Sequence, residues 1–358
     1  MPPKFLELDK KQKQMKSNTQ QSLLIIYTGG TIGMVENPED KSLKPIDFSH
    51  ILKEIPELKK ISHKLQWMSL DPIVDSSDIK PENWELMAET IYKNYHKFDG
   101  FIILHGTDTM AYSASALSFH LENLAKPVIF TGSQLPMGLV RTDGRENLLS
   151  AIEIAAVQNN NGPMVPGVSI YFENKLFQGN RTTKYSAENF NAFVSPNYPI
   201  LAESGVYLKF YKENIHYPKS GDKLSLHKKF NSHVGILKIF PGITKEFVEP
   251  ILINKHLRAI VLETFGAGNA TTEKWFIALI ISYIKSGGVV LNVSQCLAGT
   301  VEQGKYETSR ELKKAGVFGG SDITTEAAVT KLMCLLGQDI SKKKLLIRLN
   351  NSISGEIN

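Results

Sequence analysis

The chain is poor in cysteine and has no long hydrophobic run. Only two cysteines, Cys296 and Cys334, occur among 358 residues, too few for a disulfide framework or a four-cysteine zinc site. The nine histidines are scattered without a His-Glu-x-x-His pair, so no metal is predicted. The sequence contains no run of about 18 apolar residues, the length needed to span a membrane. Residues 1–21 are rich in Lys and Gln and lack the apolar segment of a secretory signal. We therefore expect a cytoplasmic protein with a tail over residues 1–21.

The chain also lacks the patterns of a nucleic-acid or nucleotide binder. Its formal net charge of +5 is small for its length, and no dense Lys/Arg stripe with interleaved aromatics occurs. The segment TGGTIG at residues 28–33 lacks the Gly-x-Gly-x-x-Gly spacing of dinucleotide sites, and no Gly-x-x-x-x-Gly-Lys-Ser/Thr segment is present. These absences favour a small-molecule substrate, with no nucleic acid or membrane as partner and no cofactor.

The composition is that of a globular protein with two domains. Hydrophobic residues make up 42% of the chain and charged residues 22%, and 358 residues exceed what one hydrophobic core usually serves. The polar stretch 213–232 contains a proline, a glycine and several lysines, and it separates two periodic regions. We predict a larger N-terminal domain over residues 22–212, a linker over 213–232 and a smaller C-terminal domain over 233–358.

Short apolar runs alternate with segments of helical periodicity. The predicted strands are 23–27, 101–104, 128–130, 168–172, 234–240, 259–262 and 289–293. The predicted helices are 111–124, 146–157 and 273–285. Asp108 or Thr109 would cap the first helix. This alternation, with continuously apolar strands, predicts an α/β fold in which helices cover both faces of parallel sheets.

Glycines and hydroxyl residues follow three of the predicted strands, in the segments TGGTIG (28–33), HGTDT (105–109) and TGSQ (131–134). Ligands of open parallel sheets bind beyond the carboxyl ends of the strands, so we expect these segments to border one pocket. Glycine lets the backbone approach a ligand and supplies N–H donors for an oxyanion. A threonine hydroxyl attacks a carbonyl only when a neighbouring group takes its proton. A single Gly-Gly-Thr turn alone is more often a tight turn or a phosphate-binding loop.

The order of the segments resembles that of the bacterial-type L-asparaginases, especially the cytoplasmic type I members. YTGGTIGM (27–34) and HGTDTM (105–110) resemble the two active-site signatures of that family. VDSSD (74–78) resembles its substrate-binding loop, and GNRTTK (179–184) resembles the segment with its catalytic lysine. The likeness continues through GGSDITTE (319–326) and leaves only the first twenty or so residues outside.

The resemblance implies a two-domain asparaginase-like fold that hydrolyses the side-chain amide of L-asparagine to L-aspartate and ammonia without a metal, and it leaves a secondary glutaminase activity open. Thr31 is implied as the nucleophile that forms an acyl-enzyme, with Thr107, Asp108 and Lys184 as the proton-handling group. The residues implied to bind the substrate are Asp75, Ser76, Ser77, Thr107, Asp108 and Gly30.

One departure from the family concerns a tyrosine. Many relatives carry it in the loop after the first signature, where it activates the nucleophile, but residues 36–48 contain none and Leu43 stands near its expected position. Some relatives supply a tyrosine from the C-terminal domain instead. Tyr306 fits that placement and is therefore implied as a catalytic residue, although a lone loop tyrosine is more often packed or exposed.

A second departure concerns regulation. Some type I relatives have an allosteric asparagine site with an arginine before Ser-Tyr-Gly, where this sequence has Glu263. A carboxylate repels the carboxylate of asparagine, so we expect little or no cooperativity. Cys296 lies in the matching neighbourhood, and we expect it to be a small buried hydrophobic residue.

Other functions remain open at this point. A dual glutaminase-asparaginase, or the amidase subunit of a tRNA-dependent amidotransferase, would keep the fold, but the latter normally has an added N-terminal domain that residues 1–21 are too short to form. A non-catalytic asparagine sensor would not need both threonines and Lys184. By analogy with the family, we expect a homodimer or homotetramer in which a neighbour completes the pocket.

Overall fold

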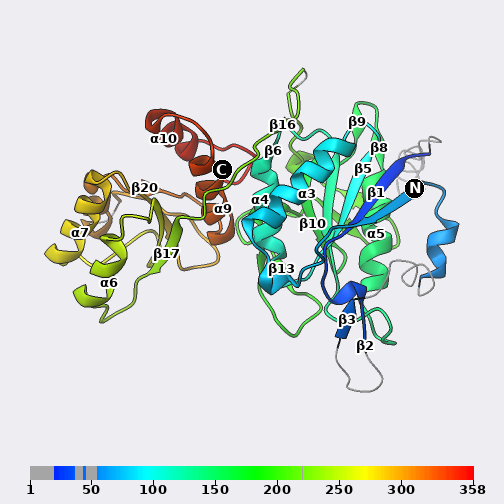
Figure 1. The fold of residues 1–358 in the computed structure, drawn as a ribbon, viewed down its shortest axis with the longest axis horizontal. Coiled ribbons are helices and arrows are strands. Elements are labelled where there is room, and N and C mark those ends of the chain that lie inside the picture. The colour runs from blue at the N-terminus through cyan, green and yellow to red at the C-terminus, as the bar shows by residue number, and fades with distance from the viewer. Residues whose placement is uncertain (1–19, 37–42, 46–54, 220, 306) are drawn as a thin grey trace, which may run out of the picture.

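The chain folds into two lobes that lie side by side, each with its own sheet (Figure 1). The computed structural model describes residues 20–36, 43–45, 55–219, 221–305 and 307–358. The larger lobe comes from the N-terminal part of the chain and the smaller lobe from the C-terminal part. Each lobe combines a sheet with covering helices, which confirms the predicted two-domain α/β fold.

The larger sheet has the strand order β15-β14-β11-β10-β7-β5-β1-β4. Its strands are β1 (Ser22–Tyr27), β4 (Lys64–Ser69), β5 (Gly100–Leu104), β7 (Pro127–Thr131), β10 (Gly167–Phe172), β11 (Lys175–Gln178), β14 (Ala202–Ser204) and β15 (Leu208–Phe210). The five strands from β4 to β10 pair in parallel. Four of them, β1, β5, β7 and β10, were predicted, whereas β4 was not. β11, β14 and β15 extend the sheet antiparallel. The sheet is therefore mixed, and the prediction of a parallel sheet holds for only one part of it.

The antiparallel part begins at a two-residue hairpin. Glu173 and Asn174 connect β10 to β11 with φ angles of 43° and 65°. Positive φ at both central residues is the geometry of a type I′ turn, whose twist suits two antiparallel strands. Only two residues separate β10 from β11, and the apolar pattern predicted β10 (as residues 168–172) but not β11.

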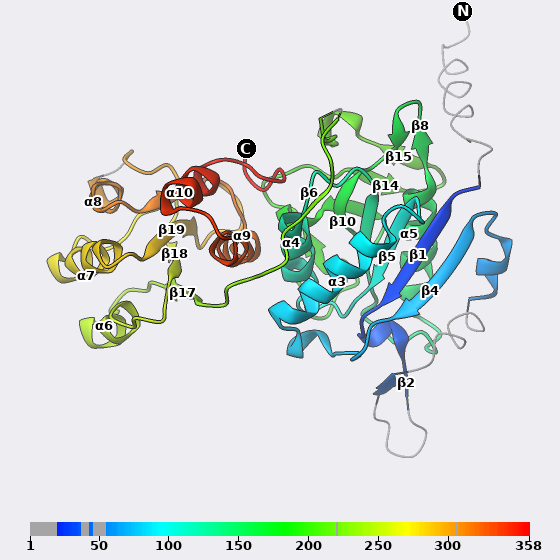
Figure 2. The same ribbon diagram turned by 45° about the horizontal axis from the view of Figure 1, so that its top comes forward.

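Helices cover both faces of the larger sheet. They are α3 (Pro81–Asn94), α4 (Met110–His120) and α5 (Gly144–Ala156). In β1, Leu23 and Ile25 pack in a buried cluster with residues of α5, whereas Leu24 and Ile26 pack with residues of α3 and α4. Figure 2 shows α3 and α4 on one side of the strands. Because successive strand residues face opposite ways, burial on both faces produces the continuously apolar strand seen in the sequence.

The first predicted helix, 111–124, is shorter in the structure because α4 ends at His120. The next residues form the short strand β6 (Leu121–Glu122), which pairs with β16 (Ser225–Leu226). Leu124 is nonetheless buried in the same core as the helix. Its apolar spacing therefore reflects burial and not a continued helix.

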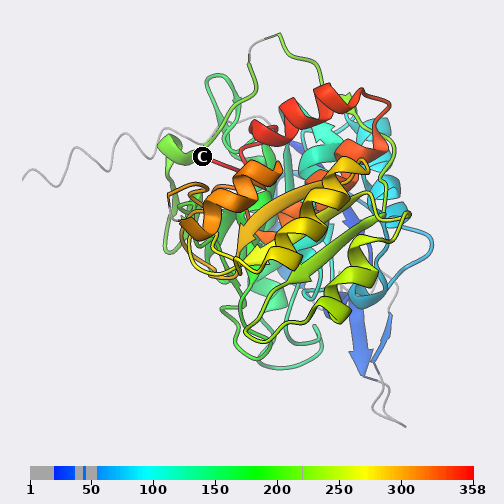
Figure 3. The same ribbon diagram turned by 90° about the vertical axis from the view of Figure 1, so that its left-hand side faces the viewer.

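The smaller lobe has a four-stranded parallel sheet, β17-β18-β19-β20. Its strands are β17 (Val234–Lys238), β18 (Ala259–Thr264), β19 (Val289–Ser294) and β20 (Phe318–Gly319). Its helices are α6 (Lys245–Leu252), α7 (Lys274–Lys285), α8 (Glu307–Ala315), α9 (Thr325–Gly337) and α10 (Lys342–Asn350). Figure 3 shows α6, α7 and α8 (yellow-green to orange) on the near face of this sheet, and α9 and α10 belong to the core cluster on its other face.

Helix α9 joins the two lobes. Its residues Ala328 and Leu332 are fully buried in the core of the smaller lobe. Phe119 of α4, in the larger lobe, belongs to the same buried cluster. The two lobes therefore share a hydrophobic interface, which fixes residues of the smaller lobe relative to the edge of the larger sheet.

The remaining short strands are β2 (Met34–Glu36), β3 (Leu43–Pro45), β8 (Gln158–Asn159), β9 (Gly162–Pro163), β12 (Thr183–Lys184) and β13 (Phe193–Val194). All seven predicted strands are present, and the predicted helices 146–157 and 273–285 correspond to α5 and α7. Within the part of the chain that the structure describes, no helix is long and apolar enough to cross a membrane.

Candidate active site

The exits of β1 and β5 lie against each other at the carboxyl edge of the larger sheet. Gly29 and Gly30 follow β1 with φ angles of 131° and 91°, which side chains other than glycine rarely adopt. A Cβ built on Gly30 would lie only 2.3 Å from the backbone nitrogen of Gly106, so the two backbones are in direct contact. The residues that follow these two glycines are Thr31 and Thr107. The fold therefore places both threonines on adjoining turns.

The turn after β1 is held by the end of the strand itself. The Tyr27 hydroxyl donates a hydrogen bond to the Gly33 carbonyl oxygen at 3.0 Å, across the 3₁₀ turn Thr31–Gly33. The Thr28 hydroxyl donates to the Leu104 carbonyl oxygen at 3.0 Å. The Thr28 hydroxyl thus links β1 to β5, whereas Thr31 is partly exposed at the start of the turn.

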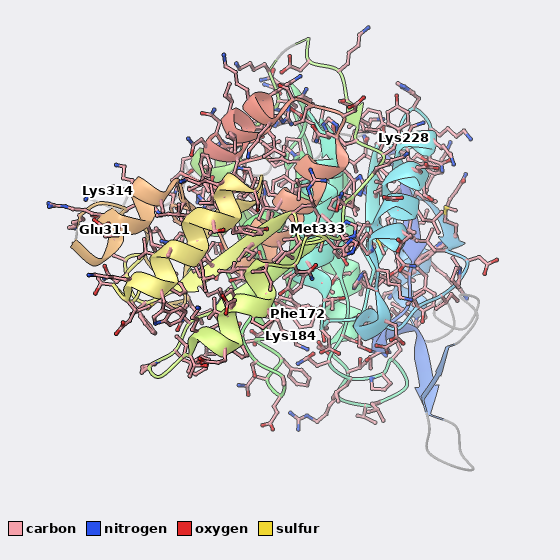
Figure 4. All side chains as sticks on the ribbon, turned by 60° about the vertical axis from the view of Figure 1, so that its left-hand side comes forward. Phe172, Lys184, Lys228, Glu311, Lys314 and Met333 are labelled. Atoms are coloured by element: carbon pink, nitrogen blue, oxygen red, sulfur yellow. The ribbon has the colours of Figure 1, made fainter. Side chains whose placement is uncertain are left out.

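A lysine joins the second threonine to its neighbouring carboxylate. The Lys184 ammonium donates to the Thr107 hydroxyl oxygen at 2.9 Å and to Asp108 Oδ1 at 2.7 Å. Lys184, labelled in Figure 4, lies on β12, whereas Thr107 and Asp108 follow β5. The Lys184 side chain is 17% exposed and that of Asp108 is 65% exposed. The structure therefore brings together three of the sequence-predicted site residues from two distant segments.

The loop after β4 lies over both strand exits. A Cβ on Gly29 would meet the Val74 carbonyl oxygen at 2.1 Å, and a Cβ on Gly106 would meet the Ser76 hydroxyl oxygen at 2.4 Å. Within this loop, the Ser77 backbone N–H and hydroxyl both donate to Asp75 Oδ1, at 2.9 and 2.7 Å. These donors hold the pKa of the Asp75 carboxyl below its usual range. Asp75 is therefore maintained as an anion beside the glycine turns.

Thr109 fastens the same loop to the start of α4. It occupies the N-cap position, but its hydroxyl donates to the Ser76 carbonyl oxygen at 2.6 Å. Thr109 is therefore the N-cap residue, as one of the two predicted candidates, but no side-chain hydrogen bond caps α4. Both side chains bind other groups: the Thr109 hydroxyl donates to the Ser76 carbonyl oxygen, and the Asp108 carboxylate accepts from Lys184.

His105 is the centre of a buried polar chain below the site. Its Nδ1 lies 2.7 Å from the Gly106 carbonyl oxygen and its Nε2 lies 2.9 Å from the Ser113 hydroxyl, which also accepts from Trp84 Nε1 at 2.9 Å. A carbonyl can only accept, so Nδ1 carries the proton and Ser113 donates to Nε2. Burial lowers the pKa of His105 to about 4. A neutral histidine thus holds the Gly106 peptide that precedes Thr107.

Two contacts from the smaller lobe hold the segment that carries Lys184. The Thr183 hydroxyl donates to the Glu326 carboxyl group, and the buried Arg181 guanidinium pairs with Asp322 at 3.0 Å. Burial raises the pKa of Glu326. The sequence comparison included residues 319–326 in the family likeness but assigned no role to Asp322 or Glu326. Only the packing of the two lobes reveals these contacts.

Three further sequence expectations concern Tyr306, Cys296 and Glu263. Tyr306 lies outside the described residues, so its position is not part of the geometry above. Cys296 is exposed in the loop after β19, and the expectation that it is buried is wrong; its backbone N–H donates to the Ser294 hydroxyl at the end of that strand. Glu263 accepts from the Thr325 hydroxyl at 2.7 Å and lies 3.5 Å from Lys238.

The fold and motifs have counterparts in known proteins. Residues 22–216 match the family described as Asparaginase, N-terminal, and residues 233–346 match the Glutaminase/Asparaginase C-terminal domain. The chain is 40% identical to L-asparaginase 1 of Escherichia coli (strain K12), over 94% of this chain and 98% of that protein. The crystal structure of L-asparaginase I from Vibrio cholerae matches with a TM-score of 0.85 and 38% identity, over 95% of this chain and 100% of that one. The thermostable L-asparaginase from Thermococcus kodakarensis matches with a TM-score of 0.85 and 29% identity, over 94% and 99%.

Together, the paired strand exits, the Lys184 contacts and these matches show that the chain belongs to the asparaginase family. Within that family it is similar along nearly its whole length to L-asparaginase 1 of Escherichia coli. The family resemblance predicted from the motifs is therefore confirmed.

Proposed function

We propose that this protein hydrolyses the side-chain amide of L-asparagine to L-aspartate and ammonia through an acyl ester on Thr31. The observation that carries the proposal is the contact of one lysine with both Thr107 and Asp108, at 2.9 and 2.7 Å. Thr107 and Asp108 lie on the turn after β5, which touches the turn of Thr31 through Gly106 and Gly30. A nucleophile and a proton-handling group are the parts that such a reaction requires.

The first half of the reaction forms the ester. The Thr31 hydroxyl oxygen attacks the side-chain carbonyl carbon, its proton is taken up by the site, and the carbonyl becomes a tetrahedral oxyanion. The C–N bond then breaks, and the nitrogen gains a proton and leaves as ammonia. Lys184, which is itself paired with Asp108, holds the Thr107 hydroxyl in place for these proton movements. Gly30 packs directly against the backbone of His105 and Gly106 and has no side chain, so we assign the oxyanion to peptide N–H groups at this edge of the site.

The second half returns the enzyme to its starting state. A water molecule attacks the ester carbonyl and loses a proton to the site as its C–O bond forms. The bond to Thr31 breaks, the threonine oxygen regains a proton, and aspartate leaves. We assign this water to the side of Thr107, because that hydroxyl contacts the Lys184 ammonium, which in turn contacts the Asp108 carboxylate.

Two charged groups at opposite ends of the substrate would fix its orientation. We assign the α-ammonium group to the carboxylates of Asp75 and Asp108, and the α-carboxylate to the hydroxyl and backbone donors around Ser76 and Ser77. The low pKa of Asp75 favours this assignment, since it keeps the carboxylate ionised. The Asp108 side chain is 65% exposed, and Lys184 contacts one of its two carboxylate oxygens, Oδ1. We assign the other oxygen to the substrate. Two anchors on so small a molecule restrict its rotation at the reacting carbonyl.

Ammonia release tests the proposal directly. The wild-type protein should release ammonia from asparagine, and Thr31→Val should reduce the rate at least a thousandfold, because no hydroxyl remains to form the ester. The matched control is Thr28→Val, which removes a hydroxyl from the same turn that donates only to the Leu104 carbonyl; it should keep more than a third of the activity. Equal activity of Thr31→Val and wild type would exclude the threonine ester. The same assay with glutamine measures the secondary glutaminase activity.

We further propose that the protein is a homodimer or homotetramer whose contact includes the smaller lobe. Ile236 on the edge strand β17, Phe240 just beyond it, and Phe247 and Ile253 at α6 are each about half exposed or more. Large apolar side chains gathered on one lobe favour burial against a second copy. Light scattering after gel filtration should give at least twice the chain mass of 39.9 kDa, and Phe247→Ser should shift the protein toward the monomer. A monomer at every concentration would exclude this assembly.

We also propose a cytoplasmic location and the domain limits 22–212 and 233–358, with residues 213–232 as linker. The unpaired Cys296 and Cys334 are compatible with a reducing compartment. Fractionation of the source cells tests the location. Limited proteolysis followed by mass spectrometry tests the limits, since the first cuts inside the fold should fall within 213–232.

A further inference from the structure

Gln134 connects the Thr107 hydroxyl to the loop that follows Lys184. Its Oε1 lies 3.0 Å from the Thr107 hydroxyl oxygen. Its Nε2 donates to the carbonyl oxygens of Ala187 and Asn189, both at 3.2 Å. Thr107 is therefore in contact with Lys184 on one side and with Gln134 on the other.

The partners of Gln134 determine the direction of each hydrogen bond. Carbonyl oxygens can only accept, so the amide N–H₂ of Gln134 must face Ala187 and Asn189, and its carbonyl oxygen must face Thr107. An amide oxygen cannot donate, so the Thr107 hydroxyl must donate to Gln134. Lys184 carries only donors, so its bond to Thr107 occupies one lone pair of the hydroxyl oxygen.

One lone pair of the Thr107 oxygen is left after these two bonds. The proton of the hydroxyl is committed to Gln134 and one lone pair to Lys184. Toward a third group, Thr107 can therefore only accept. The attacking hydroxyl or water of an amide hydrolysis must present a proton to an acceptor as its oxygen attacks, and this is the group that Thr107 is oriented to meet.

We propose that Gln134 is a positioning residue that fixes the Thr107 hydroxyl as a hydrogen-bond acceptor toward the attacking hydroxyl or water. The inference rests on the proposed roles of Thr107 and Lys184, which it extends to a residue that the sequence comparison placed only within the TGSQ segment. Gln134 acts through Thr107 and forms no bond with the reacting atoms.

The backbone of Gln134 is itself held in place. Its N–H donates to both carboxylate oxygens of Asp143, each at 3.0 Å, and the Leu135 N–H donates to the same carboxylate at 3.2 Å. Asp143 immediately precedes helix α5, which packs against the larger sheet. The side chain of Gln134 thus extends from a fixed point to a fixed pair of carbonyl acceptors. Such rigidity is what orients a hydroxyl that would otherwise rotate.

Replacing Gln134 by methionine removes the acceptor and both donors at nearly constant length. For Gln134→Met we expect kcat to fall at least tenfold while KM changes less than threefold, because the hydroxyl is disoriented and the substrate anchors are not touched. The matched control is Gln178→Met. Gln178 also donates to two loop carbonyls, those of Ser354 and Gly355, and this variant should keep kcat within threefold of wild type. A Gln134→Met variant that loses no more activity than Gln178→Met would overturn the proposal.

Gln134→Glu separates the acceptor role from the loop contacts, because an ionised carboxylate accepts from Thr107 and donates to neither carbonyl. Its kcat should exceed that of Gln134→Met at least threefold once the carboxyl is ionised. Its pH–rate profile should also gain a new fall at acid pH, where protonation turns the side chain into a donor. Activity as low as that of Gln134→Met at every pH would show that only the loop contacts matter and would refute the orientation of Thr107.

Failure of this inference differs from failure of the proposed function. If Thr31→Val and Thr107→Val both retain activity, the proposed active site is wrong. If both lose activity and Gln134→Met does not, the site stands and only the role of Gln134 is rejected.

Discussion

The contact between Gly30 and Gly106 allows the geometry of the site to be tested by adding a single methyl group. In Gly30→Ala the new Cβ would lie 2.3 Å from a backbone nitrogen, whereas ordinary contact begins at 3.4 Å, so the two turns must part by about 1.1 Å. Displacements of about 1 Å in an active site reduce rates by about 10²-fold, which corresponds to about 2.7 kcal/mol of barrier. We therefore expect kcat for asparagine to fall about a hundredfold.

The backbone conformation adds a separate cost, which needs its own control. Gly30 has a φ of 91°, and a left-handed conformation costs an alanine roughly 1–2 kcal/mol of stability. Gly167, at the start of β10 and far from the strand exits, has the same φ of 91°, but a Cβ added there would meet no atom within 4 Å. Gly167→Ala should therefore lower the melting temperature by roughly 2–8 °C and leave kcat within threefold of wild type.

The assay is ammonia release at saturating asparagine, with thermal unfolding measured on the same preparations. A Gly30→Ala variant that keeps more than a tenth of the wild-type kcat would show that catalysis does not depend on this contact between the two turns. Equal loss of activity in Gly167→Ala would show that backbone strain, and not the separation of the turns, accounts for the effect.

Three further predictions concern other parts of the chain. Tyr306→Phe should lower kcat at least tenfold, about 1.4 kcal/mol of barrier, if Tyr306 replaces the missing loop tyrosine; an unchanged rate would discard that role. The His227 hydrogen bond and the Arg348 guanidinium lower the pKa of Glu122 to about 2, so its contribution to stability is complete above about pH 4.5 and is lost as the pH falls toward 2. This contribution is on the order of 2 kcal/mol for a partly exposed carboxyl, and acid titration of unfolding should show a shallower loss for Glu122→Gln. With Glu263 at the position of the allosteric arginine of some relatives, the rate should follow a hyperbola in asparagine concentration, and a clearly sigmoidal curve would contradict this.

The sequence alone determined seven of the strands, the order of the motifs and the family. Residues 23–27 and 101–104 are apolar at every position because helices cover both faces of the sheet, and such runs are recognisable without coordinates. The segments after these strands could be expected to meet, since parallel strands end at one edge of a sheet. The limits of α4 and the antiparallel hairpin after β10 could not be read in the same way. Apolar spacing records burial, and burial does not reveal where a helix ends or a strand returns.

Only the tertiary structure decided which groups act on one another. Gln134 belongs to a recognised segment, but the direction of its amide follows from two carbonyl groups more than fifty residues away. The contact of Glu326 with Thr183 crosses the two lobes, 143 positions apart in the chain. Hydrogen bonds depend on distances of tenths of an ångström and on the direction of each donor. Local sequence patterns set the type of residue at a position, whereas these distances arise only when separate elements pack together.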